Sequence, residues 1–223
     1  MADDPLSPLL RFESPIVTPY HTGGALTLDD ESSASKLLVL ADPASPTAQQ
    51  LATTFGSAHR NEGVLVCGVR PNEWLILGSS EACWAAVATL DQEGHVSVVD
   101  LTHSRAMFRI SGAPSASALE KLCSVDWNDD MTPNLAVVSA SVAKVTCDII
   151  RDDHDGVRSY VIACDRSFGQ YLFDAVVDAA QEFRAQASLR DEIWIADDAF
   201  STEVDAEIAD LFVDDDGDEP ADR

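Results

Sequence analysis

Short apolar runs separated by polar turns dominate the middle of this chain. Runs of this length, bounded by Gly, Pro, Asn and Asp, predict β-strands. Two of them flank the turn "RPNE", in which Pro71 and Asn72 suit the central positions of a β-turn, so residues 63–80 are expected to form a hairpin. Further strands are expected at 36–42 and 160–164. Two more are expected within 95–111, one before and one after its polar turn, and another two within 135–151.

Between these runs, proline and glycine positions, a capping serine and apolar faces predict four helices, the last of which has apolar residues repeating at three, four and seven positions. Their expected ranges are 46–56, with Pro46 near the start and Gly56 at the end; 81–90, capped by Ser80; 112–123, with Pro114 in the first turn; and 166–185. The expected inward residues are Trp84, Val87 and Ala88 in the second helix; Leu119, Leu122 and Cys123 in the third; and Phe168, Tyr171, Leu172, Ala175, Val176, Ala179 and Phe183 in the fourth.

This order of strands and helices predicts an α+β domain in which helices cover one face of a mostly antiparallel sheet. The domain is expected to span residues 36–190. Residues 1–35 are rich in Pro, Ser, Gly and Asp and are expected to form an extended N-terminal arm.

Residues 191–223 form an acidic tail, with fourteen acidic residues and one basic residue. Within the tail, Phe200, Val204, Ile208 and Leu211 are spaced by 4, 4 and 3, which predicts an amphipathic helix at about 200–212. Such a helix docks in a groove on its own domain or on a partner, and the pattern leaves both open. The acidic end of the tail is expected to be disordered.

A net charge of -25 argues against nucleic-acid binding and against anionic membranes, because both require concentrated Lys and Arg. No apolar run approaches the roughly 20 residues that cross a bilayer. The acidic, proline-broken start "MADDPLSPLL" is unlike a signal peptide, so a cytoplasmic location is expected.

The motifs of nucleotide-binding loops, G-x-S-x-G hydrolases and EF-hands are absent. Two S-x-x-K matches lack the K-T-G that penicillin-recognising enzymes also need, which favours coincidence. The five cysteines are scattered without a C-x-x-C pair and are expected to be reduced and buried. We therefore expect no metal site and no cofactor bound by this chain.

The stretch "VDLTHSRAMFRISG", residues 99–112, collects the densest set of chemically capable side chains. Asp100, His103 and Arg105 could form an acid–base relay, in which Asp100 fixes the imidazole tautomer. The alternative, which we favour, is a turn between two strands. In that turn Asp100, Thr102 and Ser104 satisfy backbone donors, and Arg105 pairs with Asp100 across the hairpin. No catalytic residue is then assigned.

Three stretches together resemble one known family: "RPNEWLILG", then "VDLTHSRAMFRISGAPSASALEKLCSVDW", then "RSFGQYLFDAVVDAAQEF". In order and spacing they are similar to the gamma subunit of heterotetrameric sarcosine oxidase and, more distantly, to folate-binding aminomethyltransferase-like domains. The resemblance covers about residues 36–185. This chain has Gly169 where that family often has Ala, which is expected to weaken the helix slightly. It also lacks the family's usual glycine near 134–136.

The resemblance implies an aminomethyltransferase-like fold and a structural subunit of a heterotetramer, with the alpha subunit as main contact beside beta and delta. The complex would oxidatively demethylate sarcosine to glycine, releasing hydrogen peroxide, with tetrahydrofolate accepting the one-carbon unit as 5,10-methylenetetrahydrofolate. FAD, FMN and NAD would be held by the large alpha and beta subunits, and zinc by delta.

Two other functions are left open. In a free-standing folate-binding one-carbon protein, Asp100, Arg105 and Asp126 would be candidates for holding the pterin or its one-carbon unit. In an acidic adaptor, the helix at 200–212 would engage a basic partner.

Overall fold

The computed structural model describes residues 12–17, 25–91 and 94–183. The predicted helix at 200–212, the rest of the acidic tail and most of the N-terminal arm lie outside these residues. In the part of the chain that is described, no helix has the length and apolar character needed to span a bilayer.

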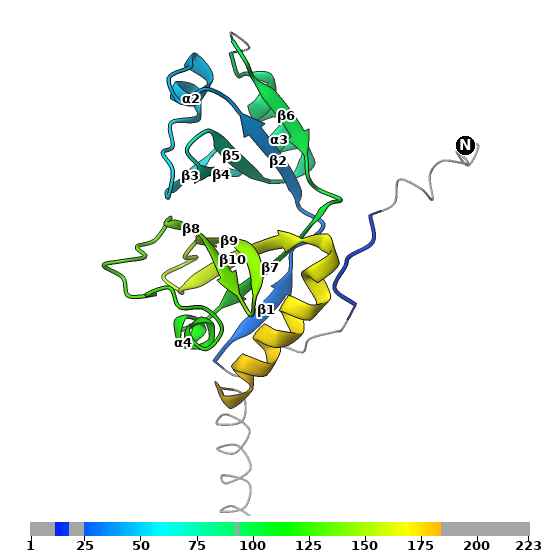
Figure 1. The fold of residues 1–223 in the computed structure, drawn as a ribbon, viewed down its shortest axis with the longest axis vertical. Coiled ribbons are helices and arrows are strands. Elements are labelled where there is room, and N and C mark those ends of the chain that lie inside the picture. The colour runs from blue at the N-terminus through cyan, green and yellow to red at the C-terminus, as the bar shows by residue number, and fades with distance from the viewer. Residues whose placement is uncertain (1–11, 18–24, 92–93, 184–223) are drawn as a thin grey trace, which may run out of the picture. The chain divides into compact units, whose positions relative to one another are not determined.

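Within the described ranges, ten strands form two five-stranded antiparallel sheets (Figure 1). Sheet A has the order β1-β7-β10-β9-β8, and sheet B has the order β3-β4-β5-β2-β6. The strands of sheet A are β1 (Thr27–Asp30), β7 (Arg105–Ser111), β8 (Val137–Val142), β9 (Val145–Arg151) and β10 (Ser159–Asp165). The strands of sheet B are β2 (Ser35–Leu40), β3 (Ala58–Asn61), β4 (Val64–Arg70), β5 (Glu73–Gly78) and β6 (Ser97–Asp100). The predicted α+β class is confirmed, with two sheets in place of the single one expected.

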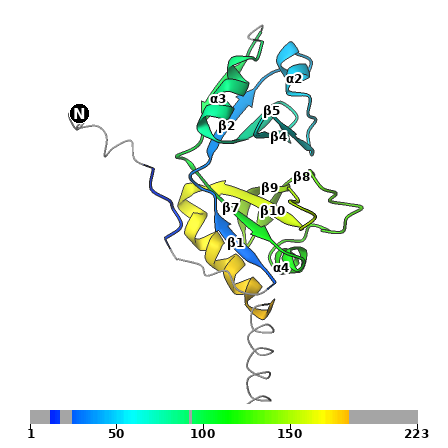
Figure 2. The ribbon, with the colours of Figure 1, turned by 180° about the vertical axis from the view of Figure 1, so that it is seen from behind.

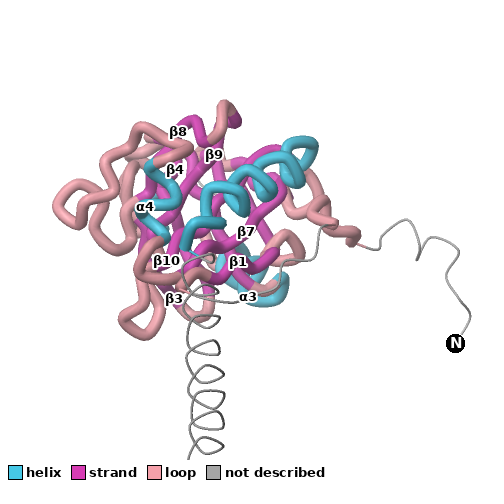
Figure 3. The backbone as a smooth tube through the Cα atoms, turned by 90° about the horizontal axis from the view of Figure 1, so that it is seen from below, coloured by secondary structure: helices cyan, strands magenta, loops and turns pink. Residues whose placement is uncertain are grey.

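The helices are α2 (Pro46–Leu51), α3 (Ser80–Ala88), α4 (Ser115–Glu120) and a longer helix over residues 169–183, which follows the short 3₁₀ turn η1 (Arg166–Phe168). α3 packs on β2 and β5 of sheet B, as Figure 2 shows from behind. Figure 3 shows α4 and the helix at 169–183 lying over the strands of sheet A.

Alternation along the strands gives each sheet two apolar faces. In β4, Val64 and Val66 pack beneath α2 and α3, whereas Leu65 and Cys67 face sheet A. In β7, Phe108 packs toward the helices and Met107 faces sheet B. The core therefore has three apolar layers, two under the helices and one between the sheets.

The strands around residues 95–111 do not form the expected hairpin. β6 pairs with β2 in sheet B, whereas β7 pairs with β1 and β10 in sheet A. The polar turn between them is a crossover, held on one side by the bond from Leu101 N to Lys36 O (2.8 Å). On the other side, Arg166 N donates to Ser104 O (2.9 Å). The separate pairing of each strand overrides the local appearance of a hairpin.

Strand β1 lies in the segment expected to be an extended arm. It pairs with β7 from Thr27 to Asp30, and Leu26 and Leu28 are buried in the core beneath the helices. The alternation of apolar and polar residues over only four positions was too short to stand out. This segment belongs to sheet A.

The helices bury somewhat different faces from those predicted. α2 is capped by Ser45 and ends at Leu51, before the expected Gly56, because Ala52 takes a left-handed backbone with φ 50°. α3 is capped by Ser79 and buries Cys83 and Val87, so Trp84 and Ala88 face outward. Phe168 in η1 and Tyr171 in the helix at 169–183 are exposed, whereas Phe173 is buried in the core. In α3 the buried face is shifted from the predicted one, whereas Leu172, Val176 and Ala179 in the last helix are buried as predicted.

The turn at 134–136 contains a leucine with a left-handed backbone. Leu135 has φ 68°, a conformation that costs a non-glycine residue free energy. Its backbone is fixed on both sides, because Leu135 N donates to Arg151 O (2.9 Å) and Leu135 O accepts from Ala58 N (2.7 Å). The turn thus keeps the backbone that glycine favours without the glycine.

All five cysteines are free thiols and buried, as predicted. Burial raises the pKa of Cys147 to about 12 and that of Cys164 to about 11. At neutral pH these groups are therefore thiols, not nucleophilic thiolates.

The replacement Gly169→Ala is expected to destabilise the domain, although alanine is the better helix former. A Cβ at residue 169 would lie 2.6 Å from Ala106 Cβ and 3.2 Å from Pro15 Cγ. We expect a loss of about 1 to 3 kcal/mol in the free energy of unfolding, measured by urea denaturation. An unchanged or increased stability would show that β7 and residues 12–17 move aside at little cost.

Candidate functional site

The turn that follows β6 uses its polar side chains to hold its own backbone. Asp100 Oδ1 accepts from Thr102 N (2.8 Å), and Thr102 Oγ1 accepts from Lys36 N (3.1 Å). Ser104 Oγ instead donates to Leu101 O (3.2 Å). Partial burial acts to raise the pKa of Asp100, but the hydrogen bonds from Thr102 outweigh it and leave that pKa below its ordinary value. The turn interpretation holds for Asp100 and Thr102.

The acid–base relay is not assembled. Among the described residues, no hydrogen bond joins Asp100 to His103. The His103 ring is exposed and packs against Phe12, with ring centroids 5.5 Å apart, and Arg166 lies 5.6 Å from the centre of the same phenyl ring. These contacts attach residues 12–17 to the domain.

Arg105 pairs with Asp148 and Asp165, not with Asp100 as expected. Asp165 lies directly opposite Arg105 in the pairing of β7 with β10. Asp148, on β9, is 2% exposed and also accepts from Ser139 Oγ (2.7 Å). Asp100 is not its partner because β6 and β7 lie in different sheets, so the two residues are not opposite each other across a hairpin.

Asp126 stabilises a local turn. Its Oδ1 accepts from Asn128 N (2.9 Å), next to the buried Trp127. In the described part of the chain, no hydrogen bond or ion pair links any two of Asp100, Arg105 and Asp126. A role for these residues in holding folate stays a prediction.

A larger polar cluster, which the sequence did not reveal, lies between the sheets. We call Glu31, Arg60, Arg109, Asp152 and His154 the Asp152 cluster. Asp152 follows β9 and is 1% exposed, and three cationic or imidazole groups converge on its Oδ2: Arg60 Nη2 at 2.5 Å, Arg109 Nη1 at 3.0 Å and His154 Nε2 at 2.9 Å. Arg109 Nε also pairs with Glu31 Oε1 at 2.5 Å.

The charges of the Asp152 cluster favour the ionised forms of both Asp152 and Arg109. Burial raises the pKa of Asp152, but the charges of Arg109 and Arg60 outweigh it and hold that pKa below its usual range. Burial likewise lowers the pKa of Arg109, and the bond and charge of Glu31 reverse the effect and raise it. Because Arg60 comes from sheet B and the other groups from sheet A and its loops, the cluster joins the two sheets electrostatically.

The family is decided by the domain comparison. The model of the GCVT N-terminal domain matches residues 60–190, which is more than half of the chain. The chain belongs to this family.

Two solved structures share the fold of this GCVT domain. A chain of "Heterotetrameric Sarcosine Oxidase from Corynebacterium sp. U-96 in complex with pyrrole 2-carboxylate" matches with a TM-score of 0.63 and 23% identity, over 73% of this chain and 88% of that one. The glycine cleavage system aminomethyltransferase T from Bartonella henselae matches with a TM-score of 0.54 and 14% identity, over 69% of this chain and 46% of that one. A search of curated proteins finds no match. The resemblance predicted from the sequence is confirmed at the level of the fold.

In this GCVT domain the Asp152 cluster escaped prediction because its members are distant in sequence. Arg60 and Asp152 are 92 residues apart, and Arg109 and Asp152 are 43 apart. The one available signal was Arg109 itself, a charged residue inside the apolar run of β7. A charge at such a position needs a buried partner.

Lys36 of the GCVT domain is buried, and among the described residues no carboxylate binds its amine. Its Nζ donates to Ser32 O (2.9 Å) and Ala34 O (2.6 Å). Burial lowers the pKa of Lys36 to about 8. Its two bonds hold the loop between β1 and β2, so we assign it a structural role.

No group of three His, Cys, Asp or Glu side chains within the described ranges is arranged to hold a metal ion. The polar atoms of the Asp152 cluster bind one another, which suits a structural bridge better than an exposed acid–base centre.

Proposed function

We propose that this chain is an assembly subunit of an oxidase of the heterotetrameric sarcosine oxidase type, equivalent to its gamma subunit. One observation carries the proposal: the likeness extends over 88% of a chain from a heterotetrameric oxidase but over only 46% of the aminomethyltransferase. The domain thus corresponds to nearly all of a chain in a four-subunit complex and to less than half of a one-carbon enzyme.

The surface chemistry supports an assembly role. Several aromatic side chains face outward, and exposed aromatic residues often anchor protein interfaces. They are Phe55 at 60% exposure, Trp84 at 46%, Phe168 at 49% and Tyr171 at 55%. In a subunit of this kind, such residues contact the alpha subunit or its neighbours.

In this proposal the redox chemistry belongs to the rest of the complex. The alpha and beta subunits hold FAD, FMN and NAD and oxidise the N-methyl amine, and tetrahydrofolate accepts the one-carbon unit. This chain contributes packing surface and no catalytic group, without nucleic acid or membrane as partners. The complex is cytoplasmic.

Co-purification tests the proposal. The full chain, tagged and co-expressed with candidate alpha, beta and delta subunits, is expected to give a stoichiometric complex that contains flavin and produces hydrogen peroxide from sarcosine. The chain alone is expected to bind no flavin and to turn over no amine. A chain that stays monomeric beside its alpha partner would overturn the proposal.

Deleting residues 191–223 separates this function from the acidic adaptor. An assembly subunit whose domain makes the main contact keeps its place in the complex after the deletion, as gel filtration would show. Loss of assembly together with an unchanged melting temperature of the domain would favour the adaptor.

The family gives one alternative, a free-standing folate-binding protein, because the aminomethyltransferase shares the fold. Calorimetric titration of the isolated chain with tetrahydrofolate decides between them. Micromolar binding that is lost in Arg105→Gln or Asp126→Asn would favour the alternative.

A further inference from the structure

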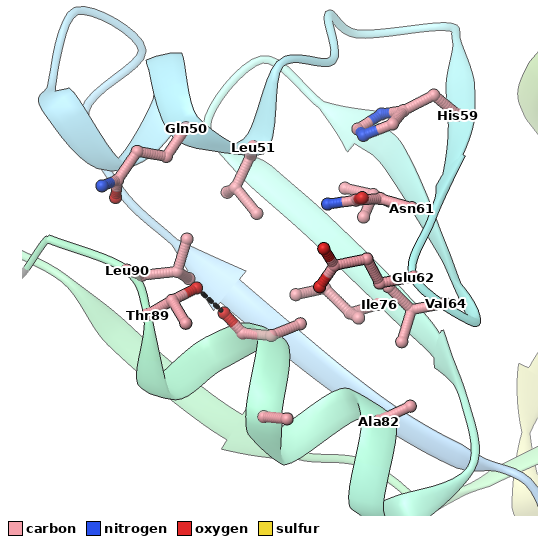
Figure 4. Close-up of a pocket in the computed structure, with 13 residues that line it drawn as sticks. Gln50, Leu51, His59, Asn61, Glu62, Val64, Ile76, Ala82, Thr89 and Leu90 are labelled. Carbon is pink, nitrogen blue, oxygen red and sulfur yellow. Dashed lines mark hydrogen bonds between the residues drawn. The ribbon is translucent and has the colours of Figure 1, made fainter.

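A pocket of about 360 Å³ lies on the outer face of sheet B, between α2, α3 and strands β3 to β5 (Figure 4). This volume falls in the range of small-molecule sites. Its lining is mixed. The apolar side chains are Leu51, Val64, Val66, Ile76, Ala82, Ala85, Ala86 and Leu90. The polar ones are Gln50, His59, Asn61, Glu62 and Thr89.

Successive side chains of β3 point to opposite faces of sheet B, so this pocket and the Asp152 cluster lie on different faces of the strand. Arg60 reaches Asp152 between the sheets, so His59 and Asn61, on either side of it, face the pocket. The His59 ring is held by a hydrogen bond between its Nδ1 and Thr53 Oγ1. Its Nε2 has no partner among the described residues and is available to a ligand.

Glu62 brings a carboxylate to the pocket from the turn between β3 and β4. In Figure 4 its side chain points into the pocket, toward the space between Leu51 and Ile76. Within the described residues, neither this carboxylate nor the amide of Asn61 has a hydrogen-bond or ion-pair partner. Apart from Glu62, the described residues of the lining include no Asp, Glu, Lys or Arg.

The backbone at Glu62 adds a second observation. Glu62 has φ 44° and Gly63 has φ 86°, the left-handed pair of a type I′ hairpin turn. Asn, Asp and Gly suit the first of these positions, whereas a glutamate there is strained. The turn therefore holds a carboxylate over the pocket at a cost in stability that a better turn residue would avoid.

From this geometry we propose that the pocket binds a small organic cation, an ammonium group carried on a compact apolar body. The ammonium pairs with the Glu62 carboxylate and donates to Asn61 Oδ1. The apolar body lies on Val66, Ile76 and Leu90. The chain's net charge of -25 favours a cationic ligand over an anionic one.

Titration of the full chain with phenethylamine, phenethyl alcohol and phenylacetate tests the ligand class, because these probes share an apolar body and differ in charge. The amine is expected to bind about tenfold or more tightly than the alcohol, and the acid is expected not to bind. Equal binding of amine and alcohol would overturn the proposal.

Variants assign the binding to this pocket. Glu62→Gln is expected to weaken binding of the amine about tenfold or more, whereas Glu120→Gln, which removes an exposed carboxylate on α4, leaves it unchanged. Ala86→Leu fills the pocket and is expected to abolish binding of both amine and alcohol. If Glu62→Gln binds the amine as the unmodified chain does, the assignment is wrong.

The variant Glu62→Asn separates ligand binding from folding. Asparagine suits the left-handed turn, so the melting temperature is expected to stay the same or rise while binding of the amine is lost. Retained amine binding would show that Glu62 is not the ligand's partner. Failure of these titrations would leave the assembly proposal untouched, because they measure ligand binding to this chain alone and not its contacts with other subunits.

Discussion

Replacing Asp152 by alanine is expected to lower the free energy of unfolding by about 3 to 5 kcal/mol, the usual result of removing one partner from a buried ion pair. The change leaves Arg109, 15% exposed, and His154 without the carboxylate on which they converge. Arg60 is 49% exposed and is partly hydrated, so most of the loss arises at Arg109. Urea denaturation measures the effect.

Asp130→Ala is the matched control, because Asp130 is an exposed aspartate on the surface loop that follows α4. It is expected to change stability by less than about 0.5 kcal/mol. If both variants lose the same small amount, the Asp152 cluster does not join the sheets as proposed.

The contribution of Asp152 should also depend on pH with a definite sign. Its pKa is lowered in the folded protein, so the unfolded chain binds the proton more readily. The stabilisation is therefore complete above the unfolded value of about 3.9 and is lost as the pH falls through the lower folded value. The difference in stability between the unmodified chain and Asp152→Ala is expected to narrow as the pH falls below about 4.

The sequence was most informative where structure is local. The hairpin of β4 and β5 could be predicted because Pro71 and Asn72 form its turn and the strands on both sides are continuous apolar runs. These strands are buried on both faces, one toward the helices and one toward sheet A. Two strands within 135–151 were also predicted from their apolar runs, and the structure pairs them as β8 and β9.

The partition of the strands into two sheets could not be predicted. β6 and β7 are adjacent in sequence and joined by a short polar turn, which is the local pattern of a hairpin. What separates them is the partner of each strand, β2 for one and β10 for the other, and these partners lie about 60 residues away. Local spacing carries no information of this kind.

In the candidate sites, too, contacts within one turn could be predicted from the sequence, whereas contacts that depend on strand pairing could not. Asp100 and Thr102 act within one turn, so their backbone bonds could be predicted from residue type. Arg105 was assigned the wrong partner because its strand was assigned the wrong neighbour. The pocket at Glu62 depends on which face of β3 lies under α3, and a strand of four residues with mixed polarity does not indicate its inner face.

Replacing Gly112 by alanine is expected to lower the free energy of unfolding by at least about 3 kcal/mol, because two separate costs add. Gly112 ends the "ISG" motif with φ 129°, a conformation that residues with a side chain rarely adopt. A Cβ there would also lie 2.1 Å from the backbone oxygen of Ala25, just before β1. The glycine cannot move aside easily, since its N–H donates to Arg158 O (2.9 Å) and its carbonyl accepts from Ser115 N (3.1 Å). Thermal and urea denaturation of the full chain measure the loss.

Gly156→Ala separates the two costs. Gly156 has φ 77°, and a Cβ placed there meets no atom within 4 Å, so this variant carries the backbone strain without the clash. It is expected to lose only about 1 to 2 kcal/mol. An excess loss in Gly112→Ala therefore measures how firmly the chain before β1 is held against β7, which is the contact that places residues 25–30 in sheet A. Equal losses in the two variants would mean that this segment yields readily, and that β1 is a weakly held edge of the sheet.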